Sequence, residues 1–181
     1  IRYPSVNLFG VFDGMNLPTG LARGNTRNVQ SMDVKRELED LSGTGFSGYV
    51  IESLLNSTGL EESALVFRNG MGVGSAYEYY SRARTLQGDE SLVHTLNAFL
   101  AEHGVVDIVE LSVQQVDLVT AFNPRIKFSK PIPKGGFKPF MKDAFDASLG
   151  EKISVTTPTN EPATKESLFK KFGLAGIEGS S

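Results

Sequence analysis

The sequence predicts an α+β domain whose helices lie mostly in the first ~100 residues, packed on a small, largely antiparallel sheet and followed by an extended C-terminal arm. Helical spacing of apolar residues is found before Gly104, whereas β-branched residues are concentrated in residues 105–122. From Pro124 onwards, proline, glycine and lysine replace periodic apolar residues. These observations predict two parts, a compact core in residues 1–123 and a basic, proline-rich arm in residues 124–181.

Four segments before Gly104 have the apolar spacing of helices. Ser31, Ser75 and Asp89 are suitable N-caps for the first, third and fourth of them. The four predicted helices are residues 31–43, 47–57, 76–86 and 89–103. Their inner faces are expected to carry Val34, Leu38, Leu41, Val50, Ile51, Leu54, Leu55, Tyr80, Ala83, Leu92, Val93, Leu96, Phe99 and Leu100.

Strands are predicted from β-branched runs and from alternating apolar and polar residues. An Asn69-Gly70 turn follows one of them, as in a two-residue hairpin. A short helix is also expected over residues 142–149, ended by Gly150. The predicted strands are residues 6–12, 64–67, 105–111, 116–122 and 125–130.

The composition excludes several kinds of chemistry. The chain has no cysteine, so it has no disulfide, thiolate metal site or cysteine nucleophile. Its two histidines, His94 and His103, fall on opposite faces of one predicted helix, and we expect no metal, no cofactor and no catalytic site. No apolar run reaches the ~20 residues that span a bilayer. A cytoplasmic location, or one inside a virion or other large complex, is favoured over secretion.

A glycine-rich segment, residues 70–75, is the candidate for anion binding. It follows a predicted strand and precedes a predicted helix, so that backbone N–H groups at the helix N-terminus would face a phosphate. The spacing differs from the dinucleotide motif and the lysine of a phosphate-binding loop is missing. A tight turn followed by a serine cap explains it equally simply. The candidate residues are Gly70, Gly72, Gly74 and Ser75.

A basic segment stands out from a chain of net charge −3. It contains no acidic residue, and Phe128, Phe137 and Phe140 are interleaved with its cations. Such a mixture suits a nucleic-acid strand, because cations bind phosphates and aromatic rings stack on bases. The alternative is that the segment lies against an acidic protein surface. Its basic residues are Arg125, Lys127, Lys130, Lys134, Lys138 and Lys142.

The end of the arm is expected to bind another subunit. Residues 154–164 form a polar linker, and Thr164 can cap a short amphipathic helix that is too short to be stable alone. We expect this helix to dock through Leu168, Phe169, Phe172, Leu174 and Ile177. The sequence therefore favours a structural subunit of a large assembly, such as a virion, that latches neighbouring subunits. A phosphate- or nucleotide-binding protein and a nucleic-acid-binding module are the alternatives.

Overall fold

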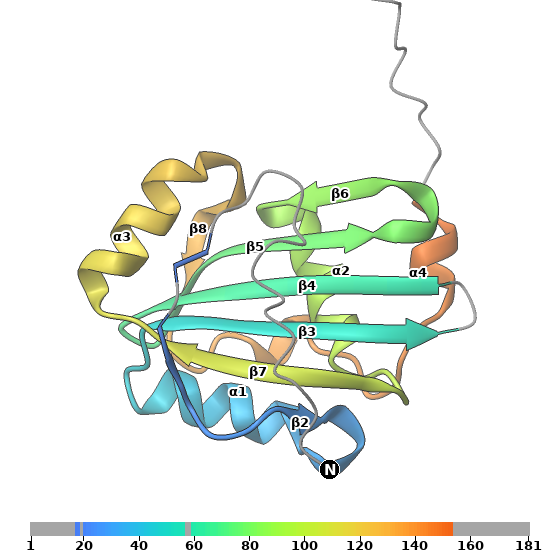
Figure 1. Cartoon of the computed structure of the whole chain (residues 1–181), viewed down its shortest axis with the longest axis horizontal. Helices are drawn as coiled ribbons and strands as arrows, with labels where there is room; N and C mark the ends of the chain where they lie inside the picture. Colours follow the sequence, from blue (N-terminus) through green and yellow to red (C-terminus); the bar gives the residue numbers. More distant parts are fainter. Residues whose placement is uncertain (1–16, 19, 57–58, 154–181) are drawn as a thin grey trace, which may run out of the picture.

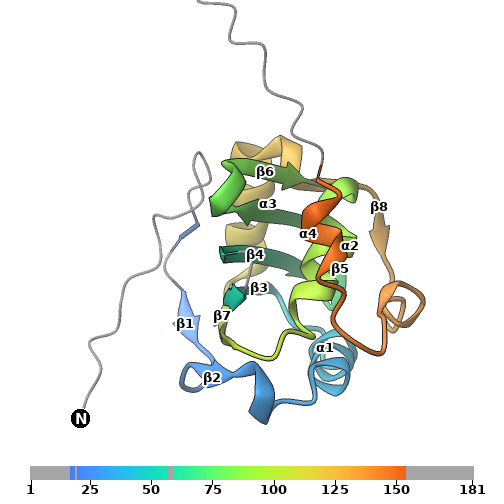
Figure 2. The ribbon, with the colours of Figure 1, turned by 90° about the vertical axis from the view of Figure 1, so that its right-hand side faces the viewer.

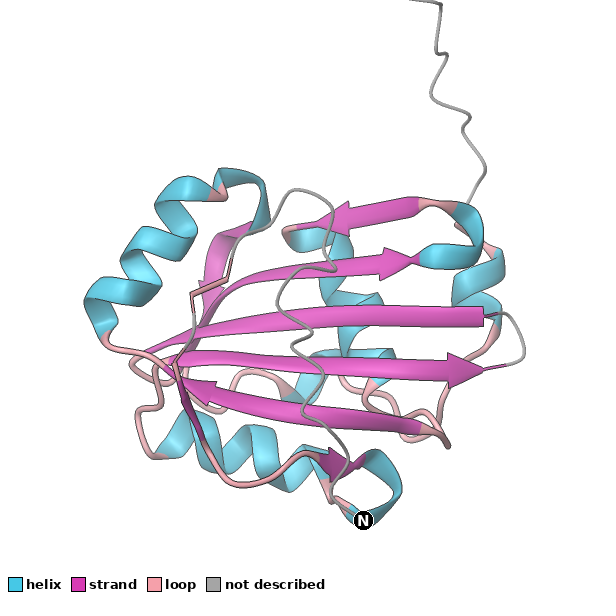
Figure 3. Ribbon diagram, viewed as in Figure 1, coloured by secondary structure: helices cyan, strands magenta, loops and turns pink. Residues whose placement is uncertain are grey.

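A computed structural model describes residues 17–18, 20–56 and 59–153. Within these residues the chain forms eight strands and four α-helices around one mainly antiparallel sheet (Figure 1, Figure 3). The strand order is β1-β7-β3-β4-β5-β6, with β2 paired to β7 and β8 paired to β5. The predicted α+β class with a largely antiparallel sheet is confirmed. The expectation that helices precede residue 100 is wrong, because two of the four described helices follow it.

The centre of the sheet is a meander of consecutive antiparallel strands. These strands are β3 (Gly48–Asn56), β4 (Gly59–Arg68), β5 (Met71–Tyr79) and β6 (Arg84–Gln87). The β4–β5 hairpin turns at Asn69 and Gly70, whose φ angles of 51° and 80° are those of a type I′ turn. The predicted turn and the predicted strand at residues 64–67 are therefore confirmed.

The predicted helices at residues 47–57 and 76–86 are wrong, because both segments belong to the meander. The sheet is covered on both faces, so its central strands carry apolar residues at successive positions. In β3, Val50 and Leu54 face one layer and Tyr49 and Ile51 face the other. A short continuous apolar run of this kind cannot be distinguished from a buried helix by its spacing.

Strand β7 (Gly104–Glu110) confirms the strand predicted at residues 105–111. The strand predicted at residues 116–122 is wrong, because this segment lies in helix α3 (Val113–Phe122). Ser112 and Gln115 form a capping box that satisfies two backbone N–H groups at the start of the helix. Val116 and Val119, three residues apart, are both buried against the sheet. This cap and this packing outweigh the β-branched composition.

Helices α1 (Val34–Gly43) and α2 (Asp89–Ala98) lie on the opposite face of the sheet from α3 (Figure 2). The side chain of Asp33, not Ser31, caps α1. Helix α2 is shorter than predicted and stops before His103. Of the residues expected on the inner faces of these two helices, the buried ones include Val34, Leu38, Leu41, Leu92, Leu96 and Phe99, but Val93 is 41% exposed. Leu55, expected on the inner face of the second predicted helix, is 65% exposed in β3.

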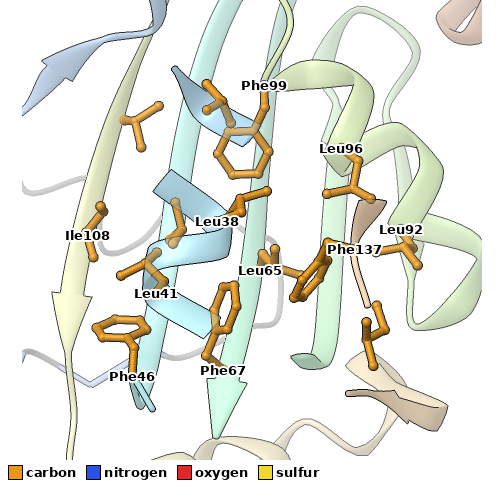
Figure 4. Close-up of a cluster of buried hydrophobic side chains, with 14 of the residues drawn as sticks. Leu38, Leu41, Phe46, Leu65, Phe67, Leu92, Leu96, Phe99, Ile108 and Phe137 are labelled. Atoms are coloured by element: carbon orange, nitrogen blue, oxygen red, sulfur yellow. The ribbon is translucent and has the colours of Figure 1, made fainter. Parts of the chain in front are cut away.

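The core has a layer on each face of the sheet. On the α1 and α2 face, apolar side chains from both helices interdigitate with β3, β4 and β7 (Figure 4). The members shown there include Leu38, Leu41, Leu65, Leu96, Phe99, Ile108 and Phe137. On the other face, α3 packs over residues that alternate with these in the strands. That cluster includes Tyr49, Ile51, Ala64, Val66, Val116 and Val119.

The sequence predicts an extended arm from Pro124, whereas residues 124–153 pack onto the core. They form β8 (Lys127–Ile132), which overlaps the strand predicted at residues 125–130, and the short helix α4 (Ser148–Glu151), which replaces the helix predicted at residues 142–149. Phe128 and Phe137 are buried in the same cluster as α1 and α2. The strand predicted at residues 6–12, the linker and the docking helix all lie outside the described residues.

Two short strands and four 3-10 turns complete the described chain. β1 (Leu21–Ala22) and β2 (Arg27–Asn28) both pair with β7 at the edge of the sheet. The turns are Val29–Ser31, Tyr80–Arg82, Pro124–Ile126 and Lys138–Phe140. Among the helices of the described residues, none is both long and apolar enough to cross a bilayer.

Candidate functional site

The glycine-rich segment forms a hairpin turn and the first half of β5, not the start of a helix. A Cβ atom at Gly72 would lie 2.6 Å from the ring of Phe137, so this glycine makes room for the core. The hydroxyl of Ser75 is buried and lies 2.8 Å from the hydroxyl of Thr95. The predicted anion site requires a helix N-terminus, but the structure has a paired strand at this place.

The basic segment is divided between the core and the surface. Lys138 pairs with Glu39 of α1 at 3.1 Å, and Lys142 pairs with Asp146 at 2.8 Å. Two of the three interleaved aromatic rings, Phe128 and Phe137, are buried and face α1 and α2 rather than solvent. A nucleic-acid strand would therefore meet the cations of this segment without those two rings.

An apolar groove of about 270 Å³ runs between α3 and the chain that leads into the sheet. Leu118 is 55% exposed and Phe122 is 79% exposed on the outer side of α3. Pro18 is held in place because its carbonyl oxygen accepts a hydrogen bond of 3.0 Å from the Tyr49 hydroxyl. The groove is lined by Leu17, Pro18, Gln115, Leu118, Val119 and Phe122.

Helix α3 is thus apolar on two sides, one buried and one exposed. Its only charged residue, Asp117, is paired with Arg68 of β4 at 2.7 Å. Large exposed apolar side chains gathered around a groove mark an interaction surface more often than isolated ones do. The sequence did not reveal this surface, because the strand prediction placed residues 116–122 in the sheet. The Ser112–Gln115 spacing was the signal for a helix start.

A second hollow lies between β6, α2 and α4, with a volume of about 370 Å³. Its walls combine ionisable side chains with an apolar floor. The lining residues are Arg84, Leu86, Glu90, His94, Leu149, Lys152 and Ile153. His94 enters it from α2, and its imidazole ring rests on the ring of Tyr77 with the centroids 5.3 Å apart. We name this hollow the His94 pocket.

The His94 imidazole is in an unusual state for a histidine. Its Nδ1 atom is buried and has no hydrogen-bond partner within the described residues. Burial lowers the pKa of His94, although the nearby carboxylates of Glu90 and Glu61 oppose the change. At neutral pH the ring is therefore mainly uncharged, with one nitrogen able to donate a hydrogen bond and the other able to accept one.

Buried glutamates lie behind this pocket in the central strands. Ser63 donates a hydrogen bond to Glu52, and the Tyr77 hydroxyl donates one to Glu61. Burial raises the pKa of Glu52 well above its ordinary value; the hydrogen bond from Ser63 opposes the rise, and the charge of Glu61 adds to it. The sequence analysis did not single out these residues, because an acid is normally expected at the surface. The four buried glutamates are Glu52, Glu61, Glu62 and Glu78.

These acids do not form a metal centre. In the part of the chain that the structure describes, no three His, Asp or Glu side chains are placed to hold one ion. On the outer face of the sheet, Glu62 instead accepts hydrogen bonds from the hydroxyls of Ser53 and Tyr80, at 3.1 and 2.9 Å. Glu52, Glu61 and Glu62 are thus tied into the sheet by hydroxyl donors.

The chain was compared with known proteins. The model of the protein family described as "Uncharacterized protein conserved in archaea" (DUF2226) matches residues 15–123. This range holds the strands from β1 to β7 and the helices α1 to α3, and so includes the α3 groove. No curated protein and no solved structure matches the chain.

Proposed function

We propose that this chain, which belongs to the protein family DUF2226 conserved in archaea, is a structural subunit of a multisubunit assembly such as a virion. In this proposal the α3 groove of one copy receives the C-terminal arm of a neighbouring copy. The role is one of binding and assembly rather than catalysis.

The observation that carries the proposal is the exposed apolar side of α3. Leu118 and Phe122 lie one helical turn apart and remain largely in water beside a groove of about 270 Å³. Each buries little of its apolar surface within its own subunit. A partner that covers them gains roughly 1.5–3 kcal/mol for each side chain that it fully buries. Protein interfaces commonly centre on such aromatic and aliphatic anchors.

The chain itself carries a segment with matching chemistry. In a helix, the apolar residues at positions 168, 169 and 172 would lie on one face, and such a face suits an apolar groove beside another helix. The charges do not oppose docking, because the one charge of α3, on Asp117, is already paired with Arg68, while the segment carries Lys165, Lys170 and Lys171 against Glu166. These features favour residues 165–177 as the occupant of the groove.

The position of the groove is compatible with a contact between copies. Helix α4, where the described chain ends, and helix α3 lie towards opposite ends of the sheet (Figure 1, Figure 2). The 11 residues from 154 to 164 span up to roughly 35 Å when extended, which is enough to reach an adjacent subunit. An arm that leaves one end and a groove at the other end give a head-to-tail contact between copies.

The test is the mass in solution of the full chain and of a variant that lacks residues 164–181. We expect the full chain to form oligomers and the truncated chain to be a folded monomer. Phe122→Glu should also give a monomer, because a carboxylate would be buried in the groove. Gln114→Glu adds the same charge at an exposed position on α3 and should leave oligomers intact.

A synthetic peptide of residues 164–181 provides a direct measurement. It should bind the truncated chain, and Phe122→Glu should abolish this binding while Gln114→Glu retains it. If the full chain is a monomer, or if truncation leaves the oligomer unchanged, the proposal fails. If the peptide binds only after residues 1–12 have been removed, the N-terminal segment of the same copy occupies the groove.

A further inference from the structure

The His94 pocket brings together three polar side chains, those of Glu90, His94 and Lys152. Glu90 and His94 lie one turn apart on α2, and Lys152 follows α4 on the facing wall. None of the three side chains makes a hydrogen bond or an ion pair with another described residue. By contrast, Lys142 and Asp146, also beside α2, pair with each other at 2.8 Å. A hollow with a few convergent polar groups is the usual form of a small-molecule site.

The Nδ1 atom of His94 is the group that most needs an explanation. It is buried, and the imidazole ring contacts the Tyr77 ring with the two planes tilted by 45°. A buried nitrogen without a partner is unfavourable, and such groups in native proteins usually mark an absent water, ion or ligand. Because burial keeps the ring mainly uncharged, it suits a ligand that both donates and accepts hydrogen bonds.

The charges around the pocket indicate the class of ligand. Glu90 supplies one negative charge, and Arg84 and Lys152 supply positive charges from other walls. Between them lies an apolar floor of Leu86, Leu149 and Ile153. This arrangement matches an ammonium group, a carboxylate and an aliphatic side chain in one small molecule. The volume of about 370 Å³ is ample for it.

We infer that the His94 pocket binds a small zwitterion with an aliphatic body, a free amino acid of the leucine type. Its ammonium group pairs with Glu90, its carboxylate pairs with Lys152 and Arg84, and its side chain covers Leu86 and Ile153. The site lies on the α2 face of the sheet, away from the α3 groove. A negative result for this site would therefore leave the proposed assembly unaffected, and a negative result for the assembly would leave this site unaffected.

Nuclear magnetic resonance of the imidazole signals tests this inference directly. The chain has only two histidines, so His94 and His103 give two separable sets of signals, which a His103→Gln variant assigns. His103, whose Nδ1 atom lies 3.3 Å from the side-chain amide of Gln30, is the internal reference. Titration of the full chain with L-leucine should shift the His94 signals, saturate, and leave those of His103 unchanged.

Two analogues separate the charges of the ligand. 4-Methylpentanoate lacks the ammonium group, and 3-methylbutylamine lacks the carboxylate. Each should bind at least about tenfold more weakly than leucine, because one ion pair is lost. Glu90→Gln should weaken the binding of leucine and of 3-methylbutylamine but not that of 4-methylpentanoate. Lys152→Met should weaken the binding of leucine and of 4-methylpentanoate but not that of 3-methylbutylamine. Glu102→Gln, at an exposed acid outside the pocket, should change none of these affinities.

Three results would overturn the inference. One is the absence of any saturable shift of His94 with leucine. Another is an equal shift of His94 and His103, which would indicate a general effect of added solute. The third is binding of 4-methylpentanoate as tight as that of leucine, which would leave no role for Glu90.

Discussion

Glu52 is enclosed on all sides in the middle of β3, with 1% of its surface exposed. A carboxylate in this position would be far from water and close to a second acid, Glu61. Burial therefore favours the protonated form, and the folded protein holds a proton that the unfolded chain releases at a lower pH. A group with a raised pKa stabilises the fold below its unfolded pKa, and this stability is lost as the pH rises through the folded value.

We predict that Glu52→Gln makes the protein more stable at pH 8, because the amide has the shape of the protonated acid but cannot ionise. The gain should grow as the pH rises above the ordinary pKa range of a glutamate, because only the natural residue then favours the unfolded chain by ionising there. At about pH 3, where glutamate is protonated in both the folded and the unfolded chain, the pH-dependent part of the gain should be absent. Urea unfolding across this range measures the difference. An exposed acid, Glu102→Gln, is the control, and a gain that does not depend on pH would contradict the prediction.

Gly74 is a contact point between β5 and the chain that leads into β8. A Cβ atom there would lie 2.7 Å from the carbonyl oxygen of Ile126, a backbone atom that cannot easily move. Gly74→Ala should therefore destabilise the protein by roughly 1–3 kcal/mol, as overpacking does. Gly43 is the matched control, because it ends α1 and its Cβ position is open. Gly43→Ala should be neutral or stabilise by up to about 1 kcal/mol. Equal thermal shifts for the two variants would show that contact with Ile126 is unimportant.

At the level of elements, α3 depends on its cap more than on its composition. The Ser112 side chain accepts a hydrogen bond of 3.2 Å from the Gln115 N–H group, and the Gln115 side chain accepts one of 2.9 Å from the Ser112 N–H group. Ser112→Ala removes one of these bonds and should cost roughly 0.5–2 kcal/mol in urea unfolding. Ser129→Ala, a serine outside the helices, is the comparison; its backbone N–H, not its side chain, bonds Asp89. If both variants unfold alike, the capping box does not stabilise α3.

The same helix explains why elements were harder to predict than buried residues. Val116 and Val119 are β-branched, and this side-chain shape favours a strand. Their three-residue spacing, however, fits one face of a helix, and the segment is helical. In β3 the error is the opposite one, because apolar residues on both faces imitate helical spacing. Helices α1 and α2, each with one buried face, were predicted in the right places. Among the strands with buried side chains on both faces, β7 was predicted correctly and β3 was not.

For the molecule as a whole, the α+β class and the antiparallel sheet were predicted from the sequence. Neither the α3 groove nor the His94 pocket was. The α3 groove needs Leu17 and Phe122, and the His94 pocket needs Arg84 and Lys152, so each depends on residues far apart in the chain. Such pairs meet only through the sheet order and the helix positions. The buried glutamates were missed for a related reason, since an acid in an apolar run is normally expected at the surface.

The sheet order has a consequence for how the protein folds. Strands β3 to β6 pair with their sequence neighbours, whereas β7 must return to β3 after the whole meander and α2 have intervened. Local pairing has a low entropic cost, and closing this long loop has a higher one. The meander should therefore be formed in the transition state, and β7 should join afterwards. Leu65→Ala in β4 should slow refolding, whereas Ile108→Ala in β7 should mainly accelerate unfolding. Stopped-flow measurements in urea separate the two rates, and slower refolding of Ile108→Ala by the same factor would place β7 in the folding nucleus instead.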